Sequence, residues 1–576
     1  MLQIIAQHPF SFNFVMCLLS YLAAGIFFNA AFMEPGEATY LLIAGIVAAC
    51  AQGYVRQIIF FLCALLLFLY HIITQGNADI LLLAELFLTA IVLYTERKDK
   101  STLLIGITGA AFLCHLFYVQ QTPVDVRQHD LSGIFLYMRQ ITQHGFNGID
   151  FNPWHMYYLF HQPLHFIVAG YLYLTGSALW ESTAAAAEGL QYLSLFYVTT
   201  ASVFAAFILR ELRLPQKIFY AGILLFMFNP TLFLFSGYIS DDTPAMMWSI
   251  IAVYFLFRWY KTEKSLYILA AAAGFGFGVL TKLSVLMAVP AIISLFLCKI
   301  STSEGKRTDI FADLCLFVII AVPLSLGWVI RNHILYDMQF YNIPDTSPWG
   351  QNFKYRTLGE RIFDFSQISK PFINAPTAVD ANIWLAMIKT ELFGEWDMSI
   401  GNVFIYVPAK LLYLLNIFLK ICTVAGILYL LHQAATDKSS RNKPFVWFFI
   451  VLYITLWGYS FKYAMDYPYA CSTDYRLFAQ LILPETAILC LCAARILRSG
   501  CRKSSFPIHI WQKAAANFLP VVALLYALLS AFIYVYGLSS ILAPAFIHTN
   551  CSQYCSSPLI SASIAADKSS SGLFIR

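Results

Sequence analysis

Acidic and histidine side chains gather in short polar segments that separate long apolar stretches. His129 and Asp130 lie early in the first large polar segment, and His161 follows later in the same segment. A carboxylate can accept a proton as a general base, and carboxylates with imidazoles can bind a divalent metal ion. We therefore predict that Asp130 is catalytic and that His129 and His161 contact the substrate. The alternative is that these are ordinary solvated or interfacial loop residues.

A second acidic pair, Asp241 and Asp242, lies just before Pro244 and an apolar run. A helix N-cap followed by proline explains one aspartate but not two. We predict that Asp241 is the second catalytic residue and that Asp242 contacts the substrate. The need for a metal stays open, and its possible ligands are Asp130, Asp241 and His161.

Three isolated cations lie beside the apolar stretches and are predicted to bind a phosphate group. Lys282 ends a segment with glycine at every second position, a pattern that indicates close helix packing rather than a nucleotide-phosphate loop. Arg331 follows an apolar stretch where a helix would leave the membrane, and an arginine fork matches phosphate geometry. Arg476 lies in a third polar segment. Anchoring at the membrane surface is the simpler role for Lys282 and Arg331.

Two further acids complete the predicted site. Glu395 ends the second large polar segment, and Asp474 lies two residues before Arg476. We predict that both acids contact the substrate. The Asp474-Tyr475-Arg476 run could bind a sugar or phosphate, or it could be a local ion pair that holds the loop.

The composition explains what must position these residues. Of the 576 residues, 60% are hydrophobic and only 12% are charged, and the mean hydropathy is +0.68. Soluble domains carry about 25% charged residues, so a soluble enzyme, a disordered chain and a nucleic-acid-binding protein are all disfavoured. The sequence contains no Cys-x-x-Cys pair, which argues against a zinc ribbon or a thioredoxin-type site. We predict an all-α polytopic membrane protein.

Apolar stretches predict about 13–15 transmembrane helices, since each crossing needs about 20 mostly apolar residues. The predicted crossings are Phe12–Phe32, Ala38–Gly53, Gln57–Thr74, Ile80–Tyr94, Thr102–Val119, Leu190–Leu209, Ile218–Phe235, Ala245–Phe257, Leu266–Leu280, Leu283–Cys298, Ile310–Ile330, Leu411–Leu431, Phe445–Phe461, Leu477–Ala494 and Ala514–Tyr536.

Basic loops predict the orientation, because cytoplasmic loops collect Lys and Arg. All basic loops fall on one side if Tyr157–Thr175 stays at the surface, which places the N-terminus in the cytoplasm and the polar segments outside. Lys420 lies within a predicted crossing, so either a cavity lies there or the boundary is wrong. Cys551 and Cys555, in the outward tail, could form a disulfide or remain free thiols.

The order of these motifs resembles the GT-C superfamily of integral membrane glycosyltransferases. Within it, the chain is similar to the bacterial branch related to protein mannosyltransferases and lipid A aminoarabinose transferases. The likeness extends from about Leu103 to Leu497. The motifs that carry it are Asp130 after an early helix, His161-Gln162-Pro163-Leu164, Asp241, the glycine-rich hairpin ending Thr281-Lys282, and Trp328-Val329-Ile330-Arg331-Asn332.

The resemblance implies a division of the chain and a reaction. Residues 1–100 would form extra N-terminal helices, 101–500 the catalytic core with outer loops 120–189 and 331–408, and 501–576 the last helix and a periplasmic tail. The donor would be a polyprenyl-phosphate-linked sugar, used at the outer face of the inner membrane. Asp130 and Asp241 match the family's two acids, and Arg331 its phosphate-binding arginine. Leu131 follows Asp130 where the family commonly has a second acid, so no metal is assigned.

The expected chemistry is an inverting transfer of the sugar to an acceptor hydroxyl, with Asp130 as base and the cations opposite the leaving phosphate. The acceptor could be a lipid, a glycan or a protein, and membrane lipids surround the chain; no nucleic acid is expected. Three alternatives remain: an envelope polysaccharide ligase or polymerase with a diphosphate-linked donor, a multi-helix transporter, and a non-catalytic scaffold. A transporter would be expected to show two similar halves, and no internal repeat is visible.

Overall fold

The computed structural model describes residues 100–144, 152, 157–180, 182–303, 305–338, 353, 355–373, 380–396, 402–436, 443–499 and 506–537. Every regular element within these ranges is helical, so the predicted all-α polytopic fold is confirmed. The four predicted crossings between Phe12 and Tyr94, and both Cys551 and Cys555, lie outside the described residues.

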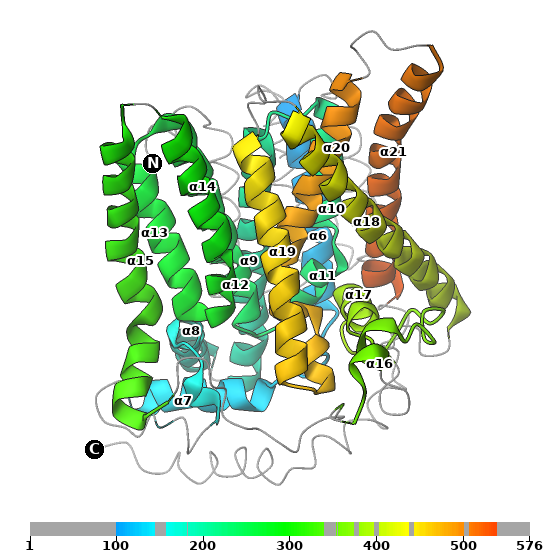
Figure 1. The fold of residues 1–576 in the computed structure, drawn as a ribbon. Helices are drawn as coiled ribbons and strands as arrows, with labels where there is room; N and C mark the ends of the chain where they lie inside the picture. The colour runs from blue at the N-terminus through cyan, green and yellow to red at the C-terminus, as the bar shows by residue number, and fades with distance from the viewer. Residues whose placement is uncertain are drawn as a thin grey trace, which may run out of the picture.

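Long apolar helices run side by side and form the body of the molecule (Figure 1). By length and composition, 7 helices in the described ranges can cross a membrane, or 8 if one bent pair counts as a crossing. The main helices of this body are α6 (Lys100–Gln120), α9 (Thr183–Glu211), α12 (Asp242–Thr262), α13 (Ser265–Thr281), α14 (Val289–Thr302), α15 (Arg307–Tyr336), α18 (Val403–Thr436), which slants across the others in Figure 1, α19 (Lys443–Asp466), α20 (Ile482–Ser499) and α21 (Phe506–Ala531).

The predicted crossing Ile218–Phe235 is broken into two helices. α10 (Gln216–Met227) and α11 (Pro230–Gly237) meet at an angle of 43°. Pro230 has no N–H to continue the helix, and the Asn229 side chain instead caps α11 by accepting from Thr231 N at 3.0 Å. The break brings the end of α11 to the polar segment that precedes α12.

Two helices near the polar segments differ from these main helices. α7 (Leu131–His144) lies across one end of the bundle, nearly at right angles to its neighbours (Figure 1). α8 (Leu164–Trp180) has 17 residues, fewer than the roughly 20 that a crossing needs. It packs on α7 and α9. α13 is equally short, so length alone does not decide whether α8 crosses, and the surface position of Tyr157–Thr175 stays a prediction.

The alternating glycines before Lys282 allow close packing, as predicted. A Cβ on Gly276 would lie 2.7 Å from the Cβ of Leu324 on α15, and one on Gly274 would lie 3.4 Å from the backbone N of Ala252 on α12. α13 is therefore held tightly between α12 and α15, which fixes Lys282 directly after its last residue.

Charged residues of the predicted cytoplasmic loops gather at the end of the bundle opposite α7. Glu211 at the end of α9 pairs with Lys261 at 2.7 Å, and Glu263 pairs with Lys299 at 2.6 Å. Arg498 donates to the backbone oxygen of Arg213 at 2.9 Å. The basic loops in the described ranges thus share one end, and the acidic segments described below share the other.

Lys420 lies near the middle of α18, which extends beyond the predicted crossing Leu411–Leu431 at both ends, so the charge is inside the bundle. Its ammonium pairs with Glu391 on α17 (Ile383–Phe393) at 2.7 Å and with Glu485 on α20. Asn229 and Asn416 donate to the two oxygens of Glu391 at 3.1 and 2.8 Å. The charge is therefore balanced by buried acids from two other helices.

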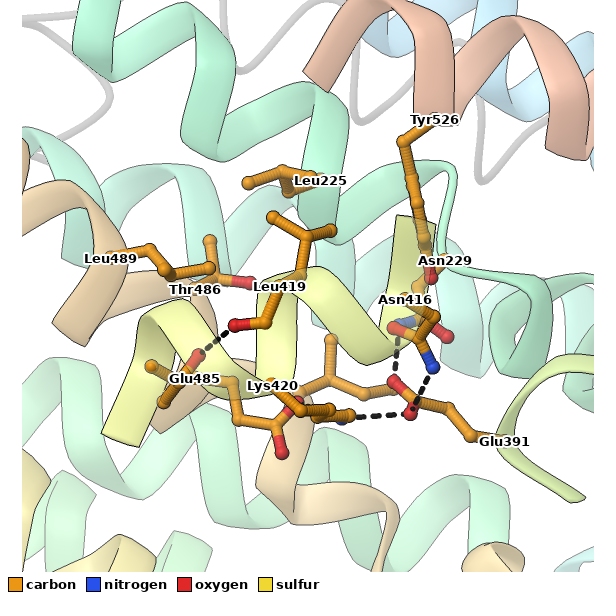
Figure 2. A pocket seen from close by; sticks show the side chains of 12 residues that line it. Leu225, Asn229, Glu391, Asn416, Leu419, Lys420, Glu485, Thr486, Leu489 and Tyr526 are labelled. Carbon is orange, nitrogen blue, oxygen red and sulfur yellow. Dashed lines mark hydrogen bonds and ion pairs between the residues drawn. The ribbon is translucent and has the colours of Figure 1, made fainter. Parts of the chain in front are cut away.

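A small cavity lies beside this charge network (Figure 2). Its volume is about 30 Å³, and Thr486 and Tyr526 lie on its wall together with the network residues. A polar cavity of this size can hold one water molecule. Lys420 therefore marks a polar centre within the bundle, as one of the two sequence alternatives proposed.

Candidate active site

The first part of the site lies where α12 begins. Asp241 and Asp242 are both buried, and Lys282 reaches them from the end of α13. The Lys282 ammonium lies 3.2 Å from Asp241 Oδ1 and also bonds directly to Asp242. Asp241 occupies the N-cap position, yet its side chain makes no capping hydrogen bond. The helix-cap alternative is therefore wrong for Asp241, whose carboxylate is aimed at neighbouring side chains instead.

His161 lies on the other oxygen of Asp241. Its Nδ1 is 3.1 Å from Asp241 Oδ2, and Tyr137 on α7 donates to its backbone oxygen at 3.0 Å. Burial by itself would raise the pKa of Asp241, but Lys282 and His161 outweigh it and hold the pKa well below its ordinary value. Asp241 therefore stays ionised in the folded protein.

Arg476 joins three separate carboxylates. Its guanidinium lies 3.0 Å from Asp474, 3.4 Å from Asp130 and 3.5 Å from Asp242. The local ion pair considered for the Asp474-Tyr475-Arg476 run is thus present, and the same arginine also links distant segments. Because one side chain contacts all three acids, Arg476 holds the acidic cluster together.

Asp130 is the exposed acid of the cluster. Its side chain is 54% exposed, against 9% for Asp241 and 2% for Asp242. Its φ of 56° lies in the left-handed region, which Asp tolerates better than most residues. Tyr158 donates to its Oδ1 at 3.5 Å. The carboxylate therefore faces solvent at the edge of the buried cluster.

The loop that carries Asp130 is fixed to the segment before α12 by Gln128. The Gln128 amide donates to the backbone oxygen of Gly237 at 2.7 Å and accepts from the backbone N of Ile239 at 3.0 Å. Sequence reasoning missed Gln128, since a single glutamine in a polar loop carries no signal of its own. Its effect is to set Asp130 beside the acids of α12.

His129 faces two further acids. Its Nε2 lies 3.6 Å from Asp474, and its Nδ1 lies 3.8 Å from Glu395, which follows α17. Burial and the nearby Asp474 raise the pKa of Glu395 to about 7, while burial and the charge of Arg476 lower the pKa of His129. At neutral pH the imidazole is therefore uncharged.

His129, Glu395 and Asp474 are the residues that could hold a metal ion. One possible ligand atom from each lies within 4.8 Å of the others. The candidates named from the sequence were Asp130, Asp241 and His161. Among the described residues these do not form such a group, because Asp130 contacts Arg476, whereas His161 and Asp241 contact each other.

Arg331 lies near the cluster but is not joined to it by the contacts above. At the end of α15 it donates to Asn332 Oδ1 at 2.7 Å, and its guanidinium lies over the rings of Trp328 and Tyr336, at 4.4 and 5.2 Å from the ring centres. Burial raises the pKa of Tyr137, with Arg331 acting to lower it and Asp241 to raise it. Tyr137 is thus within electrostatic range of both residues.

Nine of the ten residues predicted for the site therefore form one connected cluster, and Arg331 lies beside it. The nine are His129, Asp130, His161, Asp241, Asp242, Lys282, Glu395, Asp474 and Arg476.

A comparison with known families decides the class of this site. Residues 166–330 match the family model described as dolichyl-phosphate-mannose-protein mannosyltransferase. The matched segment is less than a third of the chain. The mannosyltransferase family belongs to the GT-C superfamily of membrane glycosyltransferases, so the predicted resemblance is confirmed for this segment, and the match supports a glycosyltransferase activity. No curated protein matches the chain as a relative. The matched segment includes Asp241, Asp242 and Lys282, whereas Asp130, Glu395 and Arg476 lie outside it.

Proposed function

We propose that this glycosyltransferase moves a sugar from a polyprenyl-phosphate donor to an acceptor hydroxyl, with inversion at the anomeric carbon. The donor class follows from the mannosyltransferase family of residues 166–330. The observation that carries the proposal is the geometry around Asp130. One exposed carboxylate lies beside a buried cluster that contains both acids and cations.

Asp130 acts as the general base. An acceptor hydroxyl must lose its proton while its oxygen attacks the sugar C1, and the base must reach that hydroxyl from the solvent side. The exposure of Asp130 supports this role, since Asp241 and Asp242 are buried. Direct attack on the face opposite the phosphate produces the inversion.

Lys282, Arg476 and Arg331 act on the leaving phosphate. Cleavage of the C1–O bond leaves a phosphate monoester whose negative charge grows, and cations fixed in advance stabilise that charge. Asp241, which is itself paired with His161, and Asp242 hold Lys282 in place for this purpose. Arg331 lies at the end of a membrane helix, at the depth where the phosphate of a membrane-anchored donor would lie.

The site is proposed to face the outer side of the inner membrane, with the N-terminus in the cytoplasm. The basic residues of the described loops share the opposite end of the bundle, and basic loops are retained in the cytoplasm. The acceptor is a lipid, a glycan or a protein that carries a free hydroxyl.

The first test is turnover by the purified protein with a panel of polyprenyl-phosphate sugars and membrane extract as acceptor. We expect Asp130→Asn to lower kcat by about 10²–10⁴-fold, as the loss of a general base does. The measurement is release of free polyprenyl phosphate. Asp466→Asn is the matched control, because Asp466 is also exposed and lies in an ion pair with Lys462 outside the cluster.

Two results would contradict this assignment. Equal turnover by the wild type and a folded Asp130→Asn variant would remove Asp130 as the base. An equal loss in Asp466→Asn would show that any lost surface carboxylate impairs the protein. Thermal unfolding of each variant checks that the fold is kept.

A further inference from the structure

The cluster contains more negative than positive charge. Five carboxylates face the two cations Lys282 and Arg476, which leaves three negative charges in excess when all are ionised. Like charges in a largely buried site repel one another, and burying an unbalanced charge is costly. A phosphate donor would add further negative charge. The site therefore has room, electrostatically, for another cation. The five acids are Asp130, Asp241, Asp242, Glu395 and Asp474.

His129 lies between Asp474 and Glu395, in a geometry that suits a metal ligand. Its ring nitrogens lie 3.6 and 3.8 Å from Asp474 and Glu395, beyond normal hydrogen-bond length. Two ligands of one tetrahedral ion at metal–ligand distances near 2.1 Å lie about 3.4 Å apart. His129 Nε2 is buried and has no hydrogen-bond partner. The buried Nε2 beside Asp474 is thus left without a hydrogen-bond partner, as a metal ligand would be, while Glu395 lies at the Nδ1 side of the same ring.

The surroundings hold these side chains in orientation. The imidazole packs against Trp396 and Tyr238, with ring centres 4.8 and 5.5 Å away. Arg476 donates from its side chain and from its backbone N to the two oxygens of Asp474, each at 3.0 Å. Groups that orient ligands in this way are typical of metal sites.

We propose that His129, Glu395 and Asp474 bind one divalent cation of the Zn²⁺ or Mn²⁺ type, which accept mixed nitrogen and oxygen ligands. The ion is bound through His129 Nε2, and a rotation of the Glu395 side chain closes the shell. Binding itself does not depend on the proposed reaction. The role of the ion rests on that proposed function: it offsets the excess negative charge and attracts the donor phosphate.

The test uses the full-length protein in detergent, stripped with a chelator and titrated with Mn²⁺ alone. Free Mn²⁺ gives a six-line electron paramagnetic resonance signal that is lost on binding. We expect one Mn²⁺ per chain, displaced by Zn²⁺, and at least about tenfold weaker binding in His129→Gln and in Glu395→Gln. His161→Gln is the matched control, since His161 also faces a carboxylate but lies outside the three ligands.

Each outcome decides the proposal. Absence of stoichiometric Mn²⁺ binding by the wild type overturns the proposal. Mn²⁺ binding by His129→Gln and Glu395→Gln that is as tight as binding by the wild type also overturns it. Loss of binding in His161→Gln but not in His129→Gln would also overturn it and move the ion to Asp241. If His129→Gln does not fold, Glu395→Gln decides alone. This binding test contains no donor and is therefore independent of turnover. Mn²⁺ binding together with no turnover in the separate donor assay would keep the metal site and reject the proposed transferase reaction.

Discussion

Replacing Lys420 by methionine is expected to destabilise the protein by about 3–5 kcal/mol, which is the usual cost of removing one partner from a buried ion pair. Lys420 is the cation that pairs with both Glu391 and Glu485, and the side chains of both acids are at most 9% exposed. Without it, two uncompensated carboxylates would remain inside the membrane bundle. The measurement is thermal or denaturant unfolding of the purified protein in detergent.

Glu485→Gln provides the matched control for this prediction. Two glutamates share one lysine, so the network carries one negative charge in excess. Removing the charge of Glu485 balances the network, and we expect this variant to be as stable as the wild type or more so. Lys420→Met combined with Glu485→Gln should be more stable than Lys420→Met alone. A Lys420→Met variant within 1 kcal/mol of the wild type would contradict the assigned role.

The network also connects the membrane interior to the active site. Thr390, next to Glu391 on α17, accepts from the backbone N of Tyr475 at 2.9 Å. The Lys420 ammonium lies 5.2 Å from the ring centre of the same Tyr475. Tyr475 stands between Asp474 and Arg476 in the chain, so loss of Lys420 should disturb the cluster as well as the fold.

The membrane helices could be predicted because each crossing is a local property of about 20 residues. The predicted crossings Leu190–Leu209 and Ile310–Ile330 lie within α9 and α15. The break at Asn229-Pro230 was missed, although proline after asparagine is a known signal for a helix start. The residues on both sides of the break are apolar. The mean hydropathy of a window that contains the break is therefore still that of a continuous crossing.

The pairing of site residues could not be predicted in the same way. Arg476 contacts Asp242 and Asp130 across 234 and 346 positions of the chain, and no local pattern encodes such a contact. The sequence placed these residues at the same end of the bundle only through the predicted orientation of the helices, which put all the polar segments on the outer side. The pairing of Lys420 with Glu485 could have been predicted, because charged residues inside transmembrane helices usually pair with one another. Glu485 was overlooked within an apolar run.

Arg476→Ala is expected to lower kcat by about 10²–10³-fold, the range found when one preorganised donor to a developing negative charge is removed. In the proposed reaction, Arg476 stabilises the leaving phosphate and also holds Asp130 near the acceptor. Both effects act on the chemical step, so the loss should appear in kcat more than in KM. The measurement is steady-state release of polyprenyl phosphate over a range of donor concentrations.

Two further variants complete this test: Arg476→Lys is the conservative substitution, and Arg356→Ala is the control outside the cluster. Lysine keeps the charge but cannot contact Asp474, Asp130 and Asp242 at once, so its activity should lie between those of the wild type and Arg476→Ala. Arg356 forms an exposed pair with Glu360 at 3.1 Å, and its removal should leave kcat unchanged. Wild-type kcat in a folded Arg476→Ala variant would mean that the arginine only holds the loop. The phosphate charge would then have to be stabilised by Lys282 and Arg331.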